Sequence, residues 1–246
     1  MMKLYGLIGY PLGHSFSKKY FTEKFQREGI ADATFELFPL QKIQDFPQLI
    51  NSLPDLSGLC VTIPYKEAII PYLNSIDDKG NAIAAVNCIK IKEGELIGYN
   101  TDVIGFENSL KPYLQAHPQK ALILGTGGAS KAVQFVLKKL NIDFLVVSRT
   151  PVSNVSISYN ELNQQIIHEY TIIINCTPLG MTPNIEELPS LPYSFIGKEH
   201  LLYDLVYTPS ITAFLEKGRM QGATIKNGEE MLHLQAEANW QIWNEK

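Results

Sequence analysis

The sequence lacks the features of a membrane protein, a disulfide-rich protein or a metalloprotein. Its apolar runs are short: residues 171–176 form one of the longest, far below the about 20 residues that a membrane-spanning helix needs. The three cysteines, Cys60, Cys88 and Cys176, are an odd number without Cys-x-x-Cys spacing, which argues against a disulfide framework or a zinc site. The five histidines do not cluster in the sequence, so we expect no metal site.

An excess of positive charge is also missing. The 246 residues carry a net charge of −4 without any block of lysine and arginine, which argues against nucleic-acid binding. The apolar run before Pro11 is too short for a signal peptide and fits a first strand. With 45% apolar and 19% charged residues, the composition is typical of a globular protein, and we expect a cytoplasmic protein with reduced thiols.

Short apolar runs alternate with helical patterns along the chain. This alternation predicts an α/β fold with mostly parallel sheets. The expected strands are residues 3–9, 34–38, 58–63, 121–125, 144–148, 171–175 and 201–205. The expected helices are residues 17–28, 46–53, 66–73, 104–114, 130–140 and 229–243, and residues 88–99 are expected to form a β-hairpin.

Two segments of the first half each supply one ionisable side chain after an apolar run. Lys66 ends the segment Val-Thr-Ile-Pro-Tyr-Lys, and Asp102 ends Asn-Thr-Asp. A lysine close to a carboxylate can move a proton, because each holds the other charged until burial or substrate shifts the balance. The alternative interpretations are a surface lysine and an Asp102 that caps the following helix.

A glycine-rich segment in the second half indicates a dinucleotide site. The segment Gly125-Thr126-Gly127-Gly128-Ala129 lies between an expected strand and an expected helix, where backbone N–H groups can bind a pyrophosphate. The next strand ends in Ser148-Arg149-Thr150 instead of an acidic residue. Arginine suits a ribose 2′-phosphate, so we expect NADP. A proton-transfer pair beside a nicotinamide site predicts a dehydrogenase that acts on an alcohol or a ketone.

Ser15 and Ser17 are candidates for binding a substrate carboxylate. In an extended segment they would project from the same side and donate to both carboxylate oxygens. The pattern equally fits a polar turn with Ser17 as a helix N-cap. In the second half, Thr177 follows an expected strand at the carboxyl edge of its sheet, where cofactor contacts are expected.

Several motifs in the same order resemble the shikimate dehydrogenase family. They are residues 9–17, Val-Thr-x-Pro-x-Lys at 61–66, Ala-Val-Asn at 85–87 and Asn-Thr-Asp at 100–102. The resemblance covers nearly the whole chain. It implies a substrate domain of residues 1–102 and 228–246, with the last helix packed back on it, and a Rossmann-type NADP domain of residues 103–227.

The resemblance also implies roles for individual residues. Lys66 and Asp102 would be catalytic, and Ser15, Ser17, Thr62, Asn87, Asp102, Tyr207 and Gln235 would bind the substrate. The cofactor would be bound by Gly125, Thr126, Gly127, Gly128, Ala129, Ser148, Arg149, Thr150, Thr177, Leu205, Gly228 and Asp78. The implied reaction is the reversible NADPH-dependent reduction of 3-dehydroshikimate to shikimate, by a monomer or a homodimer.

The chain departs from the family pattern at several positions. Cys60 replaces the usual asparagine, so we expect lost hydrogen bonding near the site. Pro178 removes a backbone donor, and Ser153 stands where many relatives have a second basic residue for NADP. The alternative functions are a quinate or NAD-dependent sister enzyme and a non-catalytic nucleotide-binding regulator.

Overall fold

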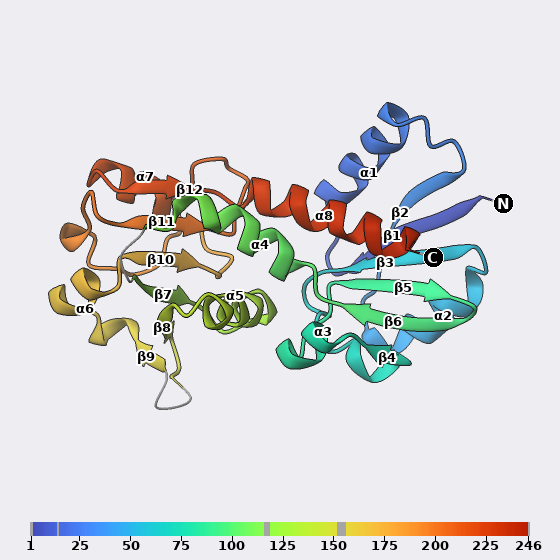
Figure 1. Cartoon of the computed structure of the whole chain (residues 1–246), viewed down its shortest axis with the longest axis horizontal. Coiled ribbons are helices and arrows are strands. Elements are labelled where there is room, and N and C mark those ends of the chain that lie inside the picture. The colour runs from blue at the N-terminus through green and yellow to red at the C-terminus, as the bar shows by residue number, and fades with distance from the viewer. Residues whose placement is uncertain (1, 14, 116–118, 152–155, 246) are drawn as a thin grey trace. The chain divides into compact units, whose positions relative to one another are not determined.

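The structure is a computed structural model that describes residues 2–13, 15–115, 119–151 and 156–245. The chain forms two compact α/β units, each built around a six-stranded sheet (Figure 1). The first unit extends to Thr101 and resumes at Gln235, and the second comprises Asp102–Leu234. Asp102 and the start of the last helix, which the family resemblance places in the substrate domain, belong to the second unit. His14 and Ser153 lie outside the described residues.

The first unit contains a mixed sheet with strand order β2-β1-β3-β5-β6-β4. In chain order its elements are β1 (Lys3–Gly9), α1 (Phe16–Arg27), β2 (Ala33–Pro39), the 3-10 helix η1 (Ile43–Asp45), α2 (Phe46–Ser52), β3 (Leu56–Val61), the 3-10 helix η2 (Ile70–Tyr72), β4 (Ser75–Ile76), α3 (Asp78–Ile83), β5 (Cys88–Lys92) and β6 (Glu95–Tyr99). The β5–β6 pair confirms the predicted hairpin.

The prediction of a helix over residues 66–73 is wrong. A turn follows Lys66, and only the short η2 forms after it. The physical reason is Pro71, which has no N–H to donate and whose ring would clash with the preceding turn of an α-helix.

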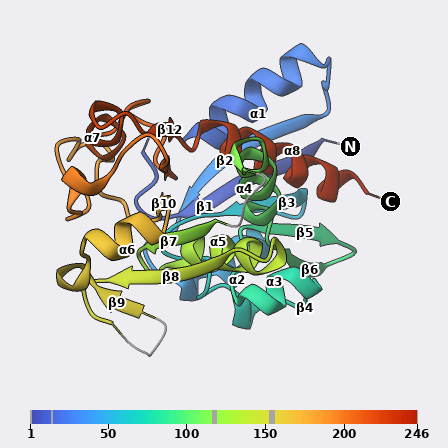
Figure 2. The same cartoon turned by 60° about the vertical axis from the view of Figure 1, so that its left-hand side comes forward.

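Alternating side chains place helices on both faces of the first sheet. Leu7 packs in a cluster with Phe21 of α1 and Trp243 of α8 (Glu229–Asn244). Its neighbour Ile8 packs in the opposite cluster with Phe46 of α2. Figures 1 and 2 show α1 and α8 side by side. The expected packing of the last helix against the first unit is therefore confirmed for its residues from Gln235 onward.

The second unit contains a fully parallel sheet with strand order β12-β11-β10-β7-β8-β9. Its elements are α4 (Asp102–Leu110), the 3-10 helix η3 (Lys111–Tyr113), β7 (Lys120–Leu124), α5 (Gly128–Lys139), β8 (Asp143–Ser148), β9 (Ser156–Ser158), the 3-10 helix η4 (Tyr159–Glu161), α6 (Gln164–Glu169), β10 (Ile172–Asn175), the 3-10 helix η5 (Tyr193–Phe195), β11 (Leu201–Asp204), α7 (Ala213–Met220) and β12 (Thr224–Lys226). The strand order changes direction between β7 and β10, which is the Rossmann pattern.

Helices cover both faces of the second sheet as well. Leu122 and Leu202 pack with Ile167 of α6 and Phe214 of α7. On the other face, Tyr203 contacts Phe106 of α4 at a ring-centroid distance of 5.3 Å. The strands are therefore buried on both sides, as their unbroken apolar runs predicted. No helix within the described ranges combines the length and the apolar character that a membrane crossing requires.

Candidate active site

Two predicted substrate residues of the first unit, Thr62 and Asn87, lie at one edge of its sheet. Strands β1 and β3 are parallel, whereas β5 is antiparallel to both β3 and β6. The carboxyl ends of β1, β3 and β6 therefore meet at the edge where β5 begins. Thr62 follows β3, Asn87 precedes β5, and Thr101 and Asp102 follow β6 closely. The topology thus brings together segments that are far apart in the sequence.

Backbone hydrogen bonds fix the position of Lys66 at this edge. The N–H of Tyr65 donates to the carbonyl oxygen of Thr62 at 2.9 Å, and the Tyr65 hydroxyl donates to that of Leu40 at 2.6 Å. The carbonyl oxygen of Lys66 accepts from the N–H of Val86 at 2.7 Å. Lys66 is half-buried, so its amine starts from an anchored backbone.

Asn87 links the ends of three strands. Its backbone carbonyl accepts from the N–H of Val61 at 2.8 Å, and its N–H donates to the carbonyl of Tyr99 at 3.0 Å. Its side-chain oxygen accepts from the N–H of Thr101 at 2.7 Å. Asp102 follows directly as the first residue of α4 and is 6% exposed. The polar side chain of Asn87 is therefore held at a fixed orientation next to the segment that supplies Asp102.

The two serines lie at the start of α1, and the extended geometry predicted for them is wrong. Ser15 is the N-cap of α1, and its hydroxyl oxygen accepts from the N–H of Lys18 at 3.4 Å. Ser17 lies inside the first turn of the helix and is not the N-cap. Both serines nevertheless lie where the positive end of the helix dipole favours an anion such as a carboxylate.

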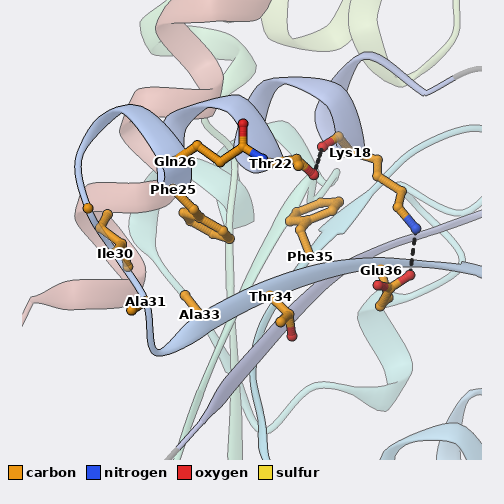
Figure 3. Close-up of a pocket in the computed structure, with 11 residues that line it drawn as sticks. Lys18, Thr22, Phe25, Gln26, Ile30, Ala31, Ala33, Thr34, Phe35 and Glu36 are labelled. Atoms are coloured by element: carbon orange, nitrogen blue, oxygen red, sulfur yellow. Dashed lines mark hydrogen bonds and ion pairs between the residues drawn. The ribbon is translucent and has the colours of Figure 1, made fainter.

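An open cavity of about 580 Å³ lies between α1 and β2 (Figure 3). It is lined mainly by α1, β2 and the turn between them, and includes Phe25, Ala33 and Phe35. At one end Lys18 points toward Glu36, with a distance of 2.6 Å between Nζ and Oε2. The Lys18 charge is thus paired with Glu36.

Gln235 is joined to β3 by Asn239, a residue that belongs to none of the sequence motifs. Gln235 is 7% exposed, and its Oε1 accepts from Nδ2 of Asn239, one turn later on α8, at 3.3 Å. Asn239 also donates to Sγ of Cys60 at 3.3 Å. The Cys60 sulfur therefore accepts a hydrogen bond from the last helix. The only sequence signal for Asn239 is its spacing of four residues from Gln235.

The glycine segment of the second unit fits a pyrophosphate. Gly125 follows β7 with φ +104, a backbone conformation that favours glycine. A Cβ at Gly127 would meet no atom within 4 Å, so the space beside this backbone is open. Gly127 is the N-cap of α5 and provides no side-chain cap, which suits N–H groups that bind an anion. The helix includes Gly128 and Ala129 and begins two residues earlier than predicted; Thr126 is exposed.

The end of β8 presents an exposed arginine. Ser148 and Thr150 form a local turn in which the N–H of Thr150 donates to the Ser148 hydroxyl oxygen at 3.3 Å. Arg149 lies between them and is exposed. Burial raises the pKa of the nearby Tyr159, while the positive charge of Arg149 opposes that rise. The Arg149 guanidinium is therefore placed to meet an anionic group at this edge.

Two further strand ends of the second unit are held by buried polar groups. Thr177 donates its hydroxyl to Oδ1 of Asn175 at 2.6 Å, and its N–H donates to the same oxygen at 3.0 Å. Nδ2 of Asn175 donates to Oδ1 of Asp204 at 2.9 Å. Burial raises the pKa of Asp204 to about 6. Thr177 is thereby oriented beside Gly125, whose Cβ, if present, would lie 3.0 Å from the Thr177 methyl carbon.

The remaining predicted residues divide between the two units. A Cβ at Gly228 would lie 2.2 Å from the carbonyl oxygen of Leu205, so only glycine permits this approach. Tyr207 is half-buried, and burial raises its pKa. Asp78 is exposed at the start of α3 in the first unit, whereas the other predicted cofactor residues lie in the second. Among the described residues, no three His, Cys, Asp or Glu side chains gather to hold a metal.

Comparison with known proteins shows similarity over nearly the whole chain. Residues 7–89 match the family model of the shikimate dehydrogenase substrate binding domain. The sequence is 37% identical to a shikimate dehydrogenase (NADP(+)) of Clostridium botulinum, over 97% of this chain and 95% of that protein. A crystal structure of shikimate dehydrogenase 1 from Peptoclostridium difficile is 35% identical, with a TM-score of 0.88 over 98% of this chain and 91% of that one.

A second similar solved structure contains ligands. It is shikimate 5-dehydrogenase from Thermus thermophilus in complex with NADP(H) and shikimate. It is 27% identical, with a TM-score of 0.87, and the match covers 99% of this chain and 94% of that chain.

Proposed function

The chain belongs to the shikimate dehydrogenase family, and on this premise we propose that it catalyses the reversible NADPH-dependent reduction of 3-dehydroshikimate to shikimate. The observation that carries the proposal is the polar edge of the first sheet. Anchored Lys66, oriented Asn87 and the segment ending in Asp102 occur together there, in a chain with a Rossmann-type second unit.

The substrate has a carboxylate and several hydroxyls, and the chain offers matching groups. We assign the carboxylate to Ser15 and Ser17 at the start of α1, where the helix dipole favours negative charge. The hydroxyls are assigned to Thr62, Asn87, Tyr207 and Gln235, in accord with the implied family roles. These side chains orient the ring, so that one carbon with its hydroxyl or carbonyl group faces the reacting groups.

Lys66 and Asp102 move the proton at the reacting oxygen. When shikimate is oxidised, hydride leaves the carbon and the hydroxyl proton leaves the oxygen. The Lys66–Asp102 pair accepts that proton and returns it to the carbonyl oxygen during reduction. The pair is treated as one unit, because coupled groups share their protonation states.

The second unit provides groups that fit NADP. Gly125, Thr126, Gly127, Gly128 and Ala129 would hold the pyrophosphate, and Ser148, Arg149 and Thr150 the ribose 2′-phosphate. Thr177, Leu205 and Gly228 would lie toward the nicotinamide, and Asp78 is retained as a further cofactor contact. Bound NADP supplies the hydride acceptor, carbon C4 of the nicotinamide ring.

Replacement of Lys66 tests the catalytic assignment. Lys66→Ala should lower kcat about 100- to 10,000-fold, because a positioned acid–base group contributes a factor of this size. Substrate binding should stay measurable by calorimetry, and exposed Lys42→Ala in the same unit should keep normal turnover. Near-normal kcat in the Lys66 variant would refute the role.

Nicotinamide absorbance, recorded with shikimate or quinate and with NADP or NAD, tests the reaction itself. We expect turnover with shikimate and NADP. Faster turnover with quinate or with NAD would favour the sister enzyme. NADP binding without turnover of either substrate would favour a nucleotide-binding regulator.

A further inference from the structure

The side chain of Asn239 is completely buried in the first unit, and its amide is shared among three neighbours. It lies on α8 at 0% exposure. Its Nδ2 donates to Oε1 of Gln235 and to Sγ of Cys60, each at 3.3 Å. Its Oδ1 accepts from the Thr101 hydroxyl at 2.6 Å. One side chain thus joins α8, β3 and the segment after β6.

The bond from Thr101 to Asn239 also determines how Thr101 meets Asn87. The Thr101 hydroxyl has one proton and lies 2.6 Å from Asn239 Oδ1 but 3.2 Å from Asn87 Oδ1. The shorter contact takes the proton, because hydroxyl hydrogen bonds are strongest near 2.7 Å. The Asn87 oxygen is then held chiefly by the backbone N–H of Thr101 at 2.7 Å. Asn239 therefore fixes the residue that orients Asn87.

The network holds the two amides that are assigned to the substrate, Gln235 and Asn87, by the same end, the oxygen. The oxygen of Gln235 accepts from Asn239, and the oxygen of Asn87 accepts from Thr101. In each amide the NH2 group is the donor end. Two such groups suit hydroxyl oxygens of the substrate that act as acceptors.

We propose that Asn239 is a positioning residue for the substrate: its amide sets the orientation of Gln235 directly and that of Asn87 through Thr101. The proposal rests on the proposed function, because it takes Gln235 and Asn87 as substrate ligands. Asn239 itself does not touch the substrate in this assignment.

Asn239→Ala should raise the KM for shikimate about tenfold, the effect expected when one or two buried hydrogen bonds that orient a ligand are lost. The KM for NADP should change less than twofold, because every group in the network belongs to the first unit. Asn239→Asp keeps the shape and the bond to Thr101 but replaces the Nδ2 donor by an oxygen. It should raise the KM for shikimate at least as much as the alanine variant.

A double-mutant cycle separates positioning from a general loss of stability. In a Gln235→Ala background, Asn239→Ala should raise the KM for shikimate by less than a third of the factor seen in the wild-type background, since residues in one network are coupled. Thermal unfolding of each variant shows that it is folded. Asn244→Ala is the matched control, because this exposed asparagine of the same helix donates to the backbone carbonyl of Trp240.

The outcomes distinguish the proposal from the function on which it rests. Wild-type turnover of shikimate together with unchanged KM in both Asn239 variants would overturn the positioning role alone. Equal factors in the two backgrounds would do the same. If the wild-type protein neither turns over nor binds shikimate, the proposed function fails, and the positioning role fails with it.

Discussion

Arg149 is the side chain on which we expect the preference between NADP and NAD to depend. It is exposed directly after β8, at the carboxyl edge where a ribose is expected in this fold. The neighbouring Ser148 and Thr150 bond to each other in a tight turn. The guanidinium is therefore the strongest donor of this segment for a 2′-phosphate.

Arg149→Ala should lower kcat/KM with NADP about 10- to 100-fold, because a charged hydrogen-bonding partner of the phosphate is lost. The value with NAD, which has no 2′-phosphate, should be nearly unchanged. Steady-state kinetics with both cofactors measure the ratio. Arg219→Ala is the control, since Arg219 pairs with Glu216 on α7 of the same unit. An equal loss with both cofactors would contradict the assignment.

Residues whose type is required by the local backbone conformation could be predicted from the sequence. Residues whose type is required by contacts with distant segments could not. Gly125 follows an apolar strand and precedes a helical pattern, so its role is visible locally. Asn239 bonds to Cys60 and Thr101, which are far away in the sequence. Local patterns contain no information about such partners, and a polar residue on a helix is ordinarily expected to face solvent.

At the scale of elements, the exact residue at which a helix starts could not be predicted from the sequence either. Ser15 and Ser17 both fit an N-cap by residue type, and only the structure shows that the N–H of Lys18 meets Ser15. The start of α5 at Gly128 was placed two residues late, because glycine has low helix propensity. The β5–β6 hairpin was predicted correctly, because two polar or flexible residues separate two alternating runs.

The connection from β11 to α7 depends on a buried carboxylate. Asp204 is 0% exposed and accepts hydrogen bonds from Thr212, Val206 and Asn175. Burial raises its pKa from 3.8 to about 6, although these hydrogen bonds act in the opposite direction. The folded state thus binds a proton that the unfolded chain releases at lower pH.

Asp204 should therefore make the protein less stable as pH rises from about 4 to about 6. The folded pKa is above the unfolded value, so the contribution is fully present below about 4 and is lost through this window, by about 3 kcal/mol. Urea unfolding of the wild type and of Asp204→Asn at pH 4, 5 and 7 measures the difference. The same pH slope in both proteins would contradict the prediction.

At the scale of the whole molecule, the alternation of strands and helices predicted both α/β units, but not where the chain returns from the second unit to the first. The last helix has one continuous pattern over residues 229–243, and the passage from the second unit back to the first falls inside it, between Leu234 and Gln235. Periodicity describes which residues share a helix face. It does not report which sheet that face covers.

Trp243 anchors this returning helix in the first unit. Its ring stacks on Tyr5 at a centroid distance of 4.8 Å, and its Nε1 donates to the carbonyl of Ile89 at 3.0 Å. Trp243→Ala should lower the free energy of unfolding by about 3–5 kcal/mol, the range for large aromatic residues in a core. Urea unfolding followed by circular dichroism measures the loss. Exposed Gln241→Ala on the same helix should change stability by less than about 0.5 kcal/mol, and a similarly small effect for Trp243 would contradict the anchoring role.

The divided first unit has a consequence for synthesis on the ribosome. Its strands emerge first, but part of its core, including Ala236 and Trp243, emerges only after the whole of Asp102–Leu234. The second unit, although later in the sequence, is continuous and can therefore complete its core earlier. The part of the first sheet that α8 covers stays exposed in the meantime, and during this interval the nascent chain is most open to chaperones and to aggregation.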